Sequence, residues 1–309
     1  MALDWGSTSL RAYLLGEDGR ILDRRAEPWG ILQLPDRDFR GAFDRITTDW
    51  SSNSRPLPVI ASGMIGSAQG WVEAPYVDLP AGADQLARQL APVPGTPLRI
   101  VPGLAQRGHS SDVMRGEETQ IVGALTLKPD IAGGLVVLPG THSKWVRLAG
   151  EVVREFTTYM TGELFAVLRA HSILGRLAPT GADSDAGSPA FARGVLAAQR
   201  SADGLAPLLF SARASVLVGD LPAEESLEFL SGLLIGDELR AGLAAGQTPA
   251  ALIGDAALCA RYVAAFEQLG ITGVSILSDA APAGLWAIAQ HASSWSQRQP
   301  GSSRNTRSG

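Results

Sequence analysis

Near its N-terminus the chain reads Asp4-Trp5-Gly6-Ser7-Thr8, and in its middle it reads Gly140-Thr141-His142-Ser143-Lys144. Each stretch interrupts an apolar run with a tight turn that offers backbone N–H groups and hydroxyls, which suit the oxygens of a phosphate group. Either stretch alone is compatible with an ordinary surface turn, because small polar residues are common in turns. Two matching stretches in one chain favour a pair of phosphate-binding turns.

The segments that follow the two turns also match each other. Apolar residues at 10–15 and 20–22 flank a turn at 16–19, and residues 145–148 and 152–153 flank a second turn in the same way. This pattern predicts a β-meander in each half of the chain. The two copies lie too far apart in the sequence to be solenoid repeats, so we expect two similar domains.

Alternating strand and helix patterns elsewhere predict an α/β fold. Strands are expected at residues 58–61, 98–102, 251–253 and 274–277, and helices at 39–50, 84–90, 163–168, 190–199, 224–243 and 256–269. We predict an N-terminal domain at 1–125 and a C-terminal domain at 126–292. Residues 293–309 are poor in apolar side chains and are expected to form a disordered tail.

Composition limits the classes of partner. The 309 residues are 45% hydrophobic and 18% charged, which is typical of a globular protein of two domains. A net charge of −5 argues against nucleic acid as the main partner, and no apolar run reaches the roughly 18 residues needed to span a membrane. The lone cysteine, Cys259, excludes a disulfide framework and paired-cysteine zinc sites and fits a cytoplasmic setting. Monomer and homodimer both remain open.

Charged residues beside the turns suit a metal-bound phosphate. Asp4 ends the first strand and could hold Mg²⁺ through water, because this ion keeps several waters and takes one or two carboxylates. Arg11 and Lys144 would add positive charge beside the phosphates.

Longer strings carry a family resemblance. They are residues 62–66, 113–120, 138–145, 160–164 and 229–236, within a match that runs from about residue 3 to residue 292. The chain resembles the 2-dehydro-3-deoxygalactonokinase family, in the superfamily of actin, hexokinase and Hsp70 ATPases. The resemblance implies a two-domain, ribonuclease H-like fold with the active site in the interdomain cleft. It also implies transfer of the ATP γ-phosphoryl group to the 6-hydroxyl of a sugar acid, 2-dehydro-3-deoxy-D-galactonate.

Two other activities stay open at this point. One is a kinase for another sugar acid or a ketose, since the sequence does not show which hydroxyl stereochemistry the protein selects. The other is an ATP-hydrolysing switch protein of the same superfamily, although no appended partner-binding module is evident.

The resemblance directs the search for a catalytic base to Glu117 and Glu118, directly after Gly116 and before an amphipathic run. Related kinases tend to have Gly-Asp here, which favours Glu117, although this chain has Glu in place of Asp. The alternative is that both glutamates only complement the positive end of a helix. Asp112 is a third candidate.

The resemblance places the adenosine motif at Gly254 and Asp255, where a strand meets a helix and glycine permits close approach of the backbone. The alternative is an ordinary turn with Asp255 as the helix N-cap. His142, in the second turn, could touch a phosphate.

The sugar acid is expected at residues 62–66, because they follow a strand and α/β proteins bind ligands at the carboxyl ends of strands. A sugar acid suits backbone donors, a flat aromatic wall and one fixed cation, and Arg115 could clamp the carboxylate. Core packing is the alternative for Trp71, and a solvent-exposed position is the alternative for Arg115. The expected contacts are Gly63, Met64, Ile65, Trp71, Tyr76 and Arg115.

Overall fold

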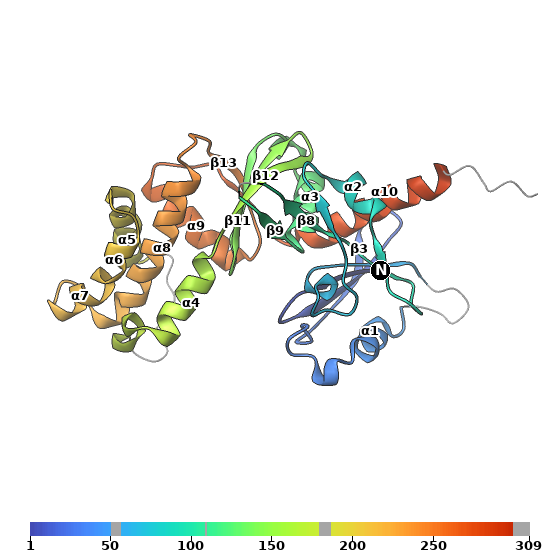
Figure 1. Cartoon of the computed structure of the whole chain (residues 1–309), viewed down its shortest axis with the longest axis horizontal. Helices are drawn as coiled ribbons and strands as arrows, with labels where there is room; N and C mark the ends of the chain where they lie inside the picture. The colour runs from blue at the N-terminus through green and yellow to red at the C-terminus, as the bar shows by residue number, and fades with distance from the viewer. Residues whose placement is uncertain (51–56, 109, 179–186, 299–309) are drawn as a thin grey trace, which may run out of the picture. The chain divides into compact units, whose positions relative to one another are not determined.

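The computed structural model describes residues 1–50, 57–108, 110–178 and 187–298. Its contacts divide the chain into two compact units. Unit 1 comprises Met1–Pro129, Glu151–Val153 and the C-terminal segment from Ala280, and unit 2 comprises Asp130–Gly150 and Arg154–Asp279. Both units combine sheets with helices, so the predicted α/β class is confirmed (Figure 1).

Unit 1 is built on a mixed sheet. Its strands are β1 (Ala2–Trp5), β2 (Leu10–Leu15), β3 (Ile21–Glu27), β4 (Val59–Ser62), β6 (Ala91–Pro92) and β7 (Leu98–Ile100). They lie in the order β3-β2-β1-β4-β7-β6, with β1, β2 and β3 antiparallel and β1, β4 and β7 parallel. A smaller sheet, which the sequence did not predict, pairs β5 (Tyr76–Asp78), β8 (Gly103–Gln106) and β9 (Asp112–Met114).

Unit 2 repeats the same strand order. Its strands are β10 (Leu135–Leu138), β11 (Ser143–Ala149), β12 (Val152–Tyr159), β13 (Pro249–Ile253) and β14 (Ser275–Leu277). The sheet reads β12-β11-β10-β13-β14, with β10 antiparallel to β11 and parallel to β13. This order matches β3-β2-β1-β4-β7 of unit 1, so the two predicted meanders and their similarity are confirmed.

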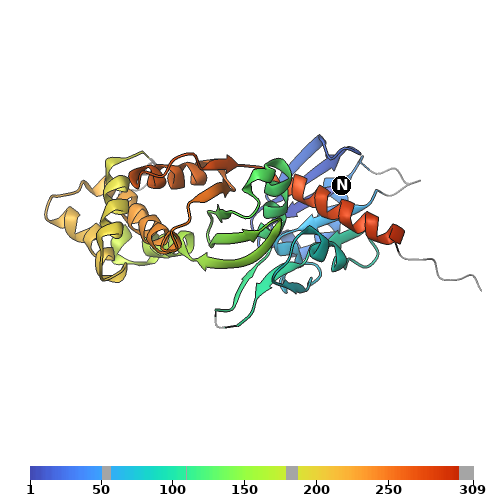
Figure 2. The ribbon, with the colours of Figure 1, turned by 90° about the horizontal axis from the view of Figure 1, so that it is seen from above.

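The helices of unit 1 are α1 (Phe39–Thr47), α2 (Ala83–Arg88), α3 (Glu117–Leu127) and α10 (Ala280–Arg298). Helix α10 packs along α3 and also contacts β1 and β4 (Figure 2). Glycines allow the two helices to cross closely. A Cβ atom on Gly123 would lie 1.8 Å from the Ala280 carbonyl oxygen, and one on Gly284 would lie 1.9 Å from that of Thr119.

The position of α10 differs from the predicted division at residues 126–292, since residues from Ala280 belong to unit 1. The physical reason is the apolar face of α10, where Leu285 and Ile288 are completely buried. The helix continues to Arg298, past the predicted start of the tail at residue 293. Residues 299–309 lie outside the described residues.

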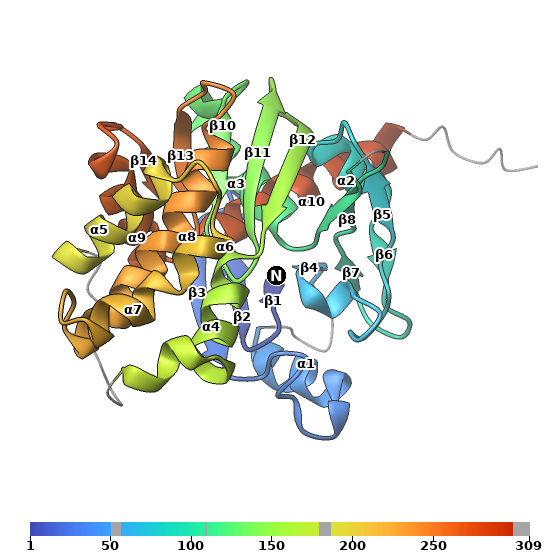
Figure 3. The same ribbon diagram turned by 60° about the vertical axis from the view of Figure 1, so that its left-hand side comes forward.

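The helices of unit 2 are α4 (Thr161–His171), α5 (Pro189–Arg200), α6 (Ala206–Leu209), α7 (Ser211–Leu217), α8 (Ser226–Gly242) and α9 (Ala256–Gln268). Helices α5, α8 and α9 pack together in Figure 3. Short 3₁₀ helices lie at Pro35–Arg37, Met64–Gly66, Pro129–Ile131, Ile173–Leu177 and Ala223–Glu225. Among the residues that the structure describes, no helix has the length and apolar character needed to cross a membrane.

Candidate functional site

The first predicted phosphate turn joins β1 to β2 and is held by the backbone of a later segment. The carbonyl oxygens of Gly6 and Ser7 accept hydrogen bonds from the N–H groups of Ile31 and Leu32, both at 3.1 Å. Thr8, next in the turn, is exposed. The turn is therefore anchored through its carbonyl groups and presents a hydroxyl to solvent.

Asp4 and Arg11 face each other across β1 and β2. They are register partners, and Arg11 Nη1 lies 3.5 Å from Asp4 Oδ2. The Asp4 side chain keeps 20% of its surface exposed. In the described ranges no three His, Cys, Asp or Glu side chains gather to hold a metal. A single carboxylate nevertheless suits Mg²⁺, which retains several waters, so Asp4 fits the predicted role.

Two glycines with positive φ bring the ends of β1 and β4 to the start of α3. Gly63 has φ 97° and Gly116 has φ 108°. A Cβ atom on Gly63 would lie 2.8 Å from the Trp5 carbonyl oxygen, and one on Gly116 would lie 3.2 Å from Gly63 Cα. The sequence segments predicted to carry the metal ligand, the sugar-acid loop and the base thus meet within unit 1.

The two candidate glutamates have different surroundings at the first turn of α3. Glu118 is 1% exposed, and its carboxyl group accepts hydrogen bonds from Gly116 N at 2.6 Å and Thr119 Oγ1 at 3.1 Å. Burial, followed by the nearby charge of Glu117, raises the pKa of Glu118 to about 8. Glu117 is only partly buried and accepts from Arg115 N at 3.0 Å. Glu118 is therefore predominantly protonated at neutral pH.

Arg115 and Tyr76, both predicted to bind the sugar acid, contact each other. The Arg115 guanidinium lies over the Tyr76 ring, 4.3 Å from its centroid, and Nη2 donates to the Ala74 carbonyl oxygen at 2.9 Å. Its Nε and Nη1 atoms are buried and have no hydrogen-bond partner in the described parts of the chain. Buried donors without a partner are rare in native proteins, so these two call for an acceptor.

Other residues of the predicted sugar-acid site serve the core. The Trp71 ring stacks on Phe39 at 6.3 Å and meets Trp5 edge-on at 6.4 Å. Ile65 is completely buried, and Met64 packs against the same cluster. The Trp71 ring therefore packs in the core, as the alternative interpretation held. In the loop at residues 62–66, backbone groups are better placed than side chains to contact a ligand.

The second predicted phosphate turn joins β10 to β11 and packs against the start of α4. Glu163 N donates to the Thr141 carbonyl oxygen at 3.0 Å, and Gly140 N donates to Ser143 Oγ at 3.4 Å. A Cβ atom on Gly162 would lie 2.5 Å from the Gly140 carbonyl oxygen. The turn and the first residues of α4 thus form one packed structure.

Two residues predicted to touch phosphate already have partners. Lys144 lies in β11, is 5% exposed and donates to Thr158 Oγ1 at 2.6 Å. His142 is exposed, and its Nε2 makes a short hydrogen bond with Glu163 Oε2. Both side chains are therefore already hydrogen-bonded within unit 2.

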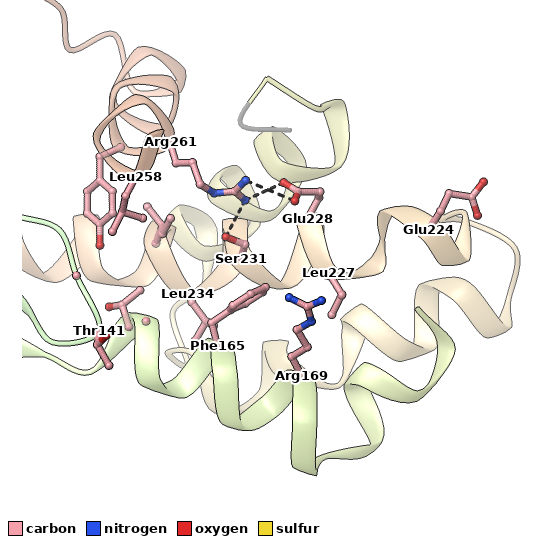
Figure 4. Close-up of a pocket in the computed structure, with 15 residues that line it drawn as sticks. Thr141, Phe165, Arg169, Glu224, Leu227, Glu228, Ser231, Leu234, Leu258 and Arg261 are labelled. Carbon is pink, nitrogen blue, oxygen red and sulfur yellow. Dashed lines mark hydrogen bonds and ion pairs between the residues drawn. The ribbon is translucent and has the colours of Figure 1, made fainter. Parts of the chain in front are cut away.

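A pocket of about 360 Å³ opens beside the second turn (Figure 4). Its walls come from α4, α8 and α9 as well as the turn itself. The lining residues are Gly140, Thr141, Thr161, Gly162, Phe165, Arg169, Glu224, Leu227, Glu228, Ser231, Leu234, Ile235, Leu258, Arg261 and Tyr262. This volume lies in the range of small-molecule sites.

Arg261 is a largely buried charged group of the pocket with several partners. It reaches from α9 to α8, where Nη2 donates to Glu228 Oε2 at 2.7 Å and to Ser231 Oγ at 2.8 Å (Figure 4). Its guanidinium also lies 4.7 Å from the Phe191 ring centroid. These residues were not predicted from the sequence, because helical periodicity does not reveal which faces of α8 and α9 meet.

The predicted adenosine motif lies at the β13–α9 junction. Gly254 has φ 144° and its N–H donates to the Leu277 carbonyl oxygen at 3.1 Å. Asp255 Oδ1 accepts from Leu258 N at 3.0 Å, so Asp255 is the N-cap of α9, as the alternative held. The cap nevertheless positions Leu258, which lines the pocket.

Comparisons with known proteins show the family of the chain. The 2-keto-3-deoxy-galactonokinase family matches residues 4–288. The 2-dehydro-3-deoxygalactonokinase of Escherichia coli strain K12 is 39% identical over 94% of this chain and 97% of its own length. A probable 2-dehydro-3-deoxygalactonokinase of Rhizobium meliloti strain 1021 is 38% identical over 94% of this chain and 96% of its own length.

Solved structures agree as well. The crystal structure of a Sinorhizobium meliloti protein described as a candidate 2-dehydro-3-deoxygalactonokinase has a TM-score of 0.85 at 38% identity and covers 94% of this chain and 97% of its own. The fold is shared more distantly with the activator of a Clostridium difficile 2-hydroxyisocaproyl-CoA dehydratase, with a TM-score of 0.51 at 12% identity, covering 97% of this chain and 98% of its own. The chain belongs to the 2-keto-3-deoxy-galactonokinase family.

Proposed function

We propose that this protein transfers the γ-phosphoryl group of ATP to the 6-hydroxyl of 2-dehydro-3-deoxy-D-galactonate, as part of galactonate catabolism. The named activity of its relatives supports this substrate. The observation that carries the proposal is the pocket of about 360 Å³ that begins at the Gly140–Thr141 turn. It combines room for a nucleoside with backbone groups suited to phosphate oxygens.

The nucleotide is assigned to unit 2. Its phosphates would bind at Gly140 and Thr141, and its base would lie among the apolar side chains of Phe165, Leu227 and Leu258. Gly254 and Asp255 contribute by fixing the start of α9. His142 would reach a phosphate only if its hydrogen bond to Glu163 broke. Lys144 would contribute positive charge from its buried position beside Thr158.

The first turn, in unit 1, is assigned to magnesium and to phosphate oxygens. Asp4 would hold Mg²⁺ directly or through water, and Thr8 and Arg11 would face the phosphates together with Gly6 and Ser7. When bound, the ion neutralises charge on the phosphate oxygens.

The sugar acid is assigned to unit 1. Its carboxylate is assigned to the Arg115 guanidinium, whose buried Nε and Nη1 atoms have no hydrogen-bond partner among the described residues and would reach the ligand after a local rearrangement. The Tyr76 ring already fixes the plane of the guanidinium. Backbone groups at Gly63, Met64 and Ile65 would bind the hydroxyls, while Trp71 supports the loop from the core.

Glu117 is assigned as the general base. Glu118 is unsuited to this role, because it is buried and its pKa of about 8 keeps it protonated. In the reaction the 6-hydroxyl oxygen attacks the γ-phosphorus, the bond from that phosphorus to the bridging oxygen breaks, and ADP leaves. Glu117 accepts the hydroxyl proton, so the charges balance.

The same proposal includes a reducing, cytoplasmic setting, which suits use of ATP and a chain whose Cys259 is unpaired and buried. A monomer and a homodimer are both compatible with these assignments.

Magnesium-dependent ADP release tests the proposal. It should be measured with 2-dehydro-3-deoxy-D-galactonate, its gluconate epimer, glycerol and common hexoses, beside a control without acceptor. Release only with the galactonate derivative is the expected result. Preference for another acceptor would reassign the substrate, and release without any acceptor would favour an ATP-hydrolysing switch.

A further inference from the structure

Behind the second phosphate turn, three neutral donors converge on the carboxylate of Glu238. Trp145 Nε1 donates to Oε1 at 2.8 Å, and the Tyr262 hydroxyl donates to Oε2 at 2.7 Å. Thr161 Oγ1 also donates to Oε2. Glu238 lies on α8 and is 2% exposed. Burial raises the pKa of Glu238, whereas its hydrogen bonds oppose that effect.

One arm of this network leads to the turn through Tyr262. The Tyr262 hydroxyl oxygen lies 2.9 Å from Ser143 Oγ, which in turn accepts the Gly140 N–H at 3.4 Å. Because a carboxylate only accepts, the Tyr262 proton points to Glu238 and the tyrosine oxygen accepts from Ser143. The hydrogen bonds therefore run from the Gly140 amide towards the carboxylate, and Ser143 also hydrogen-bonds Glu238 itself.

A second arm leads to the opposite side of the same turn. Thr161 begins α4, and the next two residues contact the turn directly. Gly162 leaves no room for a Cβ atom beside the Gly140 carbonyl group, and Glu163 N donates to the Thr141 carbonyl oxygen at 3.0 Å. A single buried carboxylate is thus linked by hydrogen bonds to both segments that flank the turn, to β11 through Tyr262 and Ser143 and to α4 through Thr161.

We propose that Glu238 is a positioning residue that fixes the phosphate-binding turn for ATP, through Tyr262 and Ser143 on one side and Thr161 on the other. The inference rests on the proposed binding of ATP at this turn. Glu238 does not line the pocket, so its influence passes through the residues that do.

Trp145 provides a matched control. Its indole N–H donates to the same carboxylate as Tyr262, but from the side of Oε1, away from the Tyr262–Ser143 path. Glu238→Gln, Tyr262→Phe and Trp145→Phe each alter one buried partner of the network. Only the first two change the path to the turn, which separates positioning from general loss of stability.

The experiment measures ADP binding by calorimetry in wild type and each variant, then the KM for ATP, the KM for the sugar acid and kcat. We expect Glu238→Gln and Tyr262→Phe to weaken ADP binding and raise the KM for ATP about tenfold, as for one lost hydrogen bond. The KM for the sugar acid should stay within about twofold, and Trp145→Phe should leave both KM values within the same margin. The double variant should be no worse than Glu238→Gln, since both changes act on one path.

Each contrary result is distinct. If both Glu238→Gln and Tyr262→Phe kept the wild-type affinity for ADP and the wild-type KM for ATP, the inference would be overturned and the proposed function would stand. An equal loss in Trp145→Phe, or additive losses in the double variant, would show general destabilisation and overturn it too. Wild type that binds no ADP would overturn the proposed function and the inference with it. Should Glu238→Gln fail to fold, Tyr262→Phe decides alone.

Discussion

The backbone N–H of Gly116 donates to Glu118 Oε2 at 2.6 Å, so the Glu118 side chain folds back onto the N-cap residue of its own helix. Its neighbour Glu117 accepts from Arg115 N instead and keeps part of its surface exposed. Asp112 lies in β9 and accepts the N–H of its neighbour Val113 at 2.8 Å. These differences separate three carboxylates that the sequence left as alternatives, and they favour Glu117 as the base.

Glu117→Gln should lower kcat by about 10²- to 10⁴-fold, which is the usual contribution of a general base. ATP binding should remain near wild type, since the nucleotide is assigned to other residues. The matched variant Glu118→Gln should lose less, because glutamine still accepts from Gly116. Steady-state kinetics and ADP calorimetry check both variants. Wild-type turnover in Glu117→Gln would exclude it as the base.

The raised pKa of Glu118 predicts how the stability of the protein depends on pH. Between its ordinary value of 4.5 and the folded value of about 8, the folded protein retains a proton that the unfolded chain releases. The free energy of unfolding should therefore fall as pH rises through this range. Urea unfolding from about pH 5 to pH 8 should show a smaller decrease for Glu118→Gln than for wild type. An equal decrease in the free energy of unfolding for wild type and Glu118→Gln would contradict the raised pKa of Glu118.

Arg115→Lys should raise the KM for the sugar acid about tenfold or more and leave the KM for ATP unchanged. Lysine keeps the charge but loses the planar fork and the stacking on Tyr76. Tyr76→Phe, which preserves the ring face, should have a smaller effect. Acceptor titrations at saturating ATP measure both. An equal rise in the two KM values would point to a loss of folding instead of carboxylate recognition.

The repeated meanders and most elements of both units could be predicted, because apolar spacing and turn residues are local properties of the sequence. Helix α10 was not predicted, because the contacts that hold it are with residues distant in the sequence. Its partner α3 lies far away in the chain, and Gly284 signals a close helix crossing only once Thr119 is known to face it. The burial of Lys144 could not be predicted either, because it depends on which face of β11 packs into the interior of unit 2, where Lys144 donates to Thr158.

The α3–α10 crossing gives a prediction about stability. Gly284→Ala would place a Cβ atom 1.9 Å from the Thr119 carbonyl oxygen, so the helices must move apart. We expect a loss of about 1–3 kcal/mol in the free energy of unfolding, as for other overpacked sites. Gln290→Ala, at an exposed position of the same helix, is the control and should change little. Thermal unfolding compares them, and equal melting temperatures would argue against the close crossing.

The Glu228–Arg261 pair allows stability and nucleotide binding to be separated. Both side chains are 11% exposed, so removing one partner leaves a largely buried charge. Arg261→Met should therefore lower the free energy of unfolding by about 3 kcal/mol and also weaken ADP binding. Adding Glu228→Leu removes the unpaired charge, so the double variant should regain stability. It should not regain ADP affinity if the pair contacts the nucleotide, because the polar groups of the pocket are then absent. Recovery of both properties would show that the pair serves only the packing of α8 against α9.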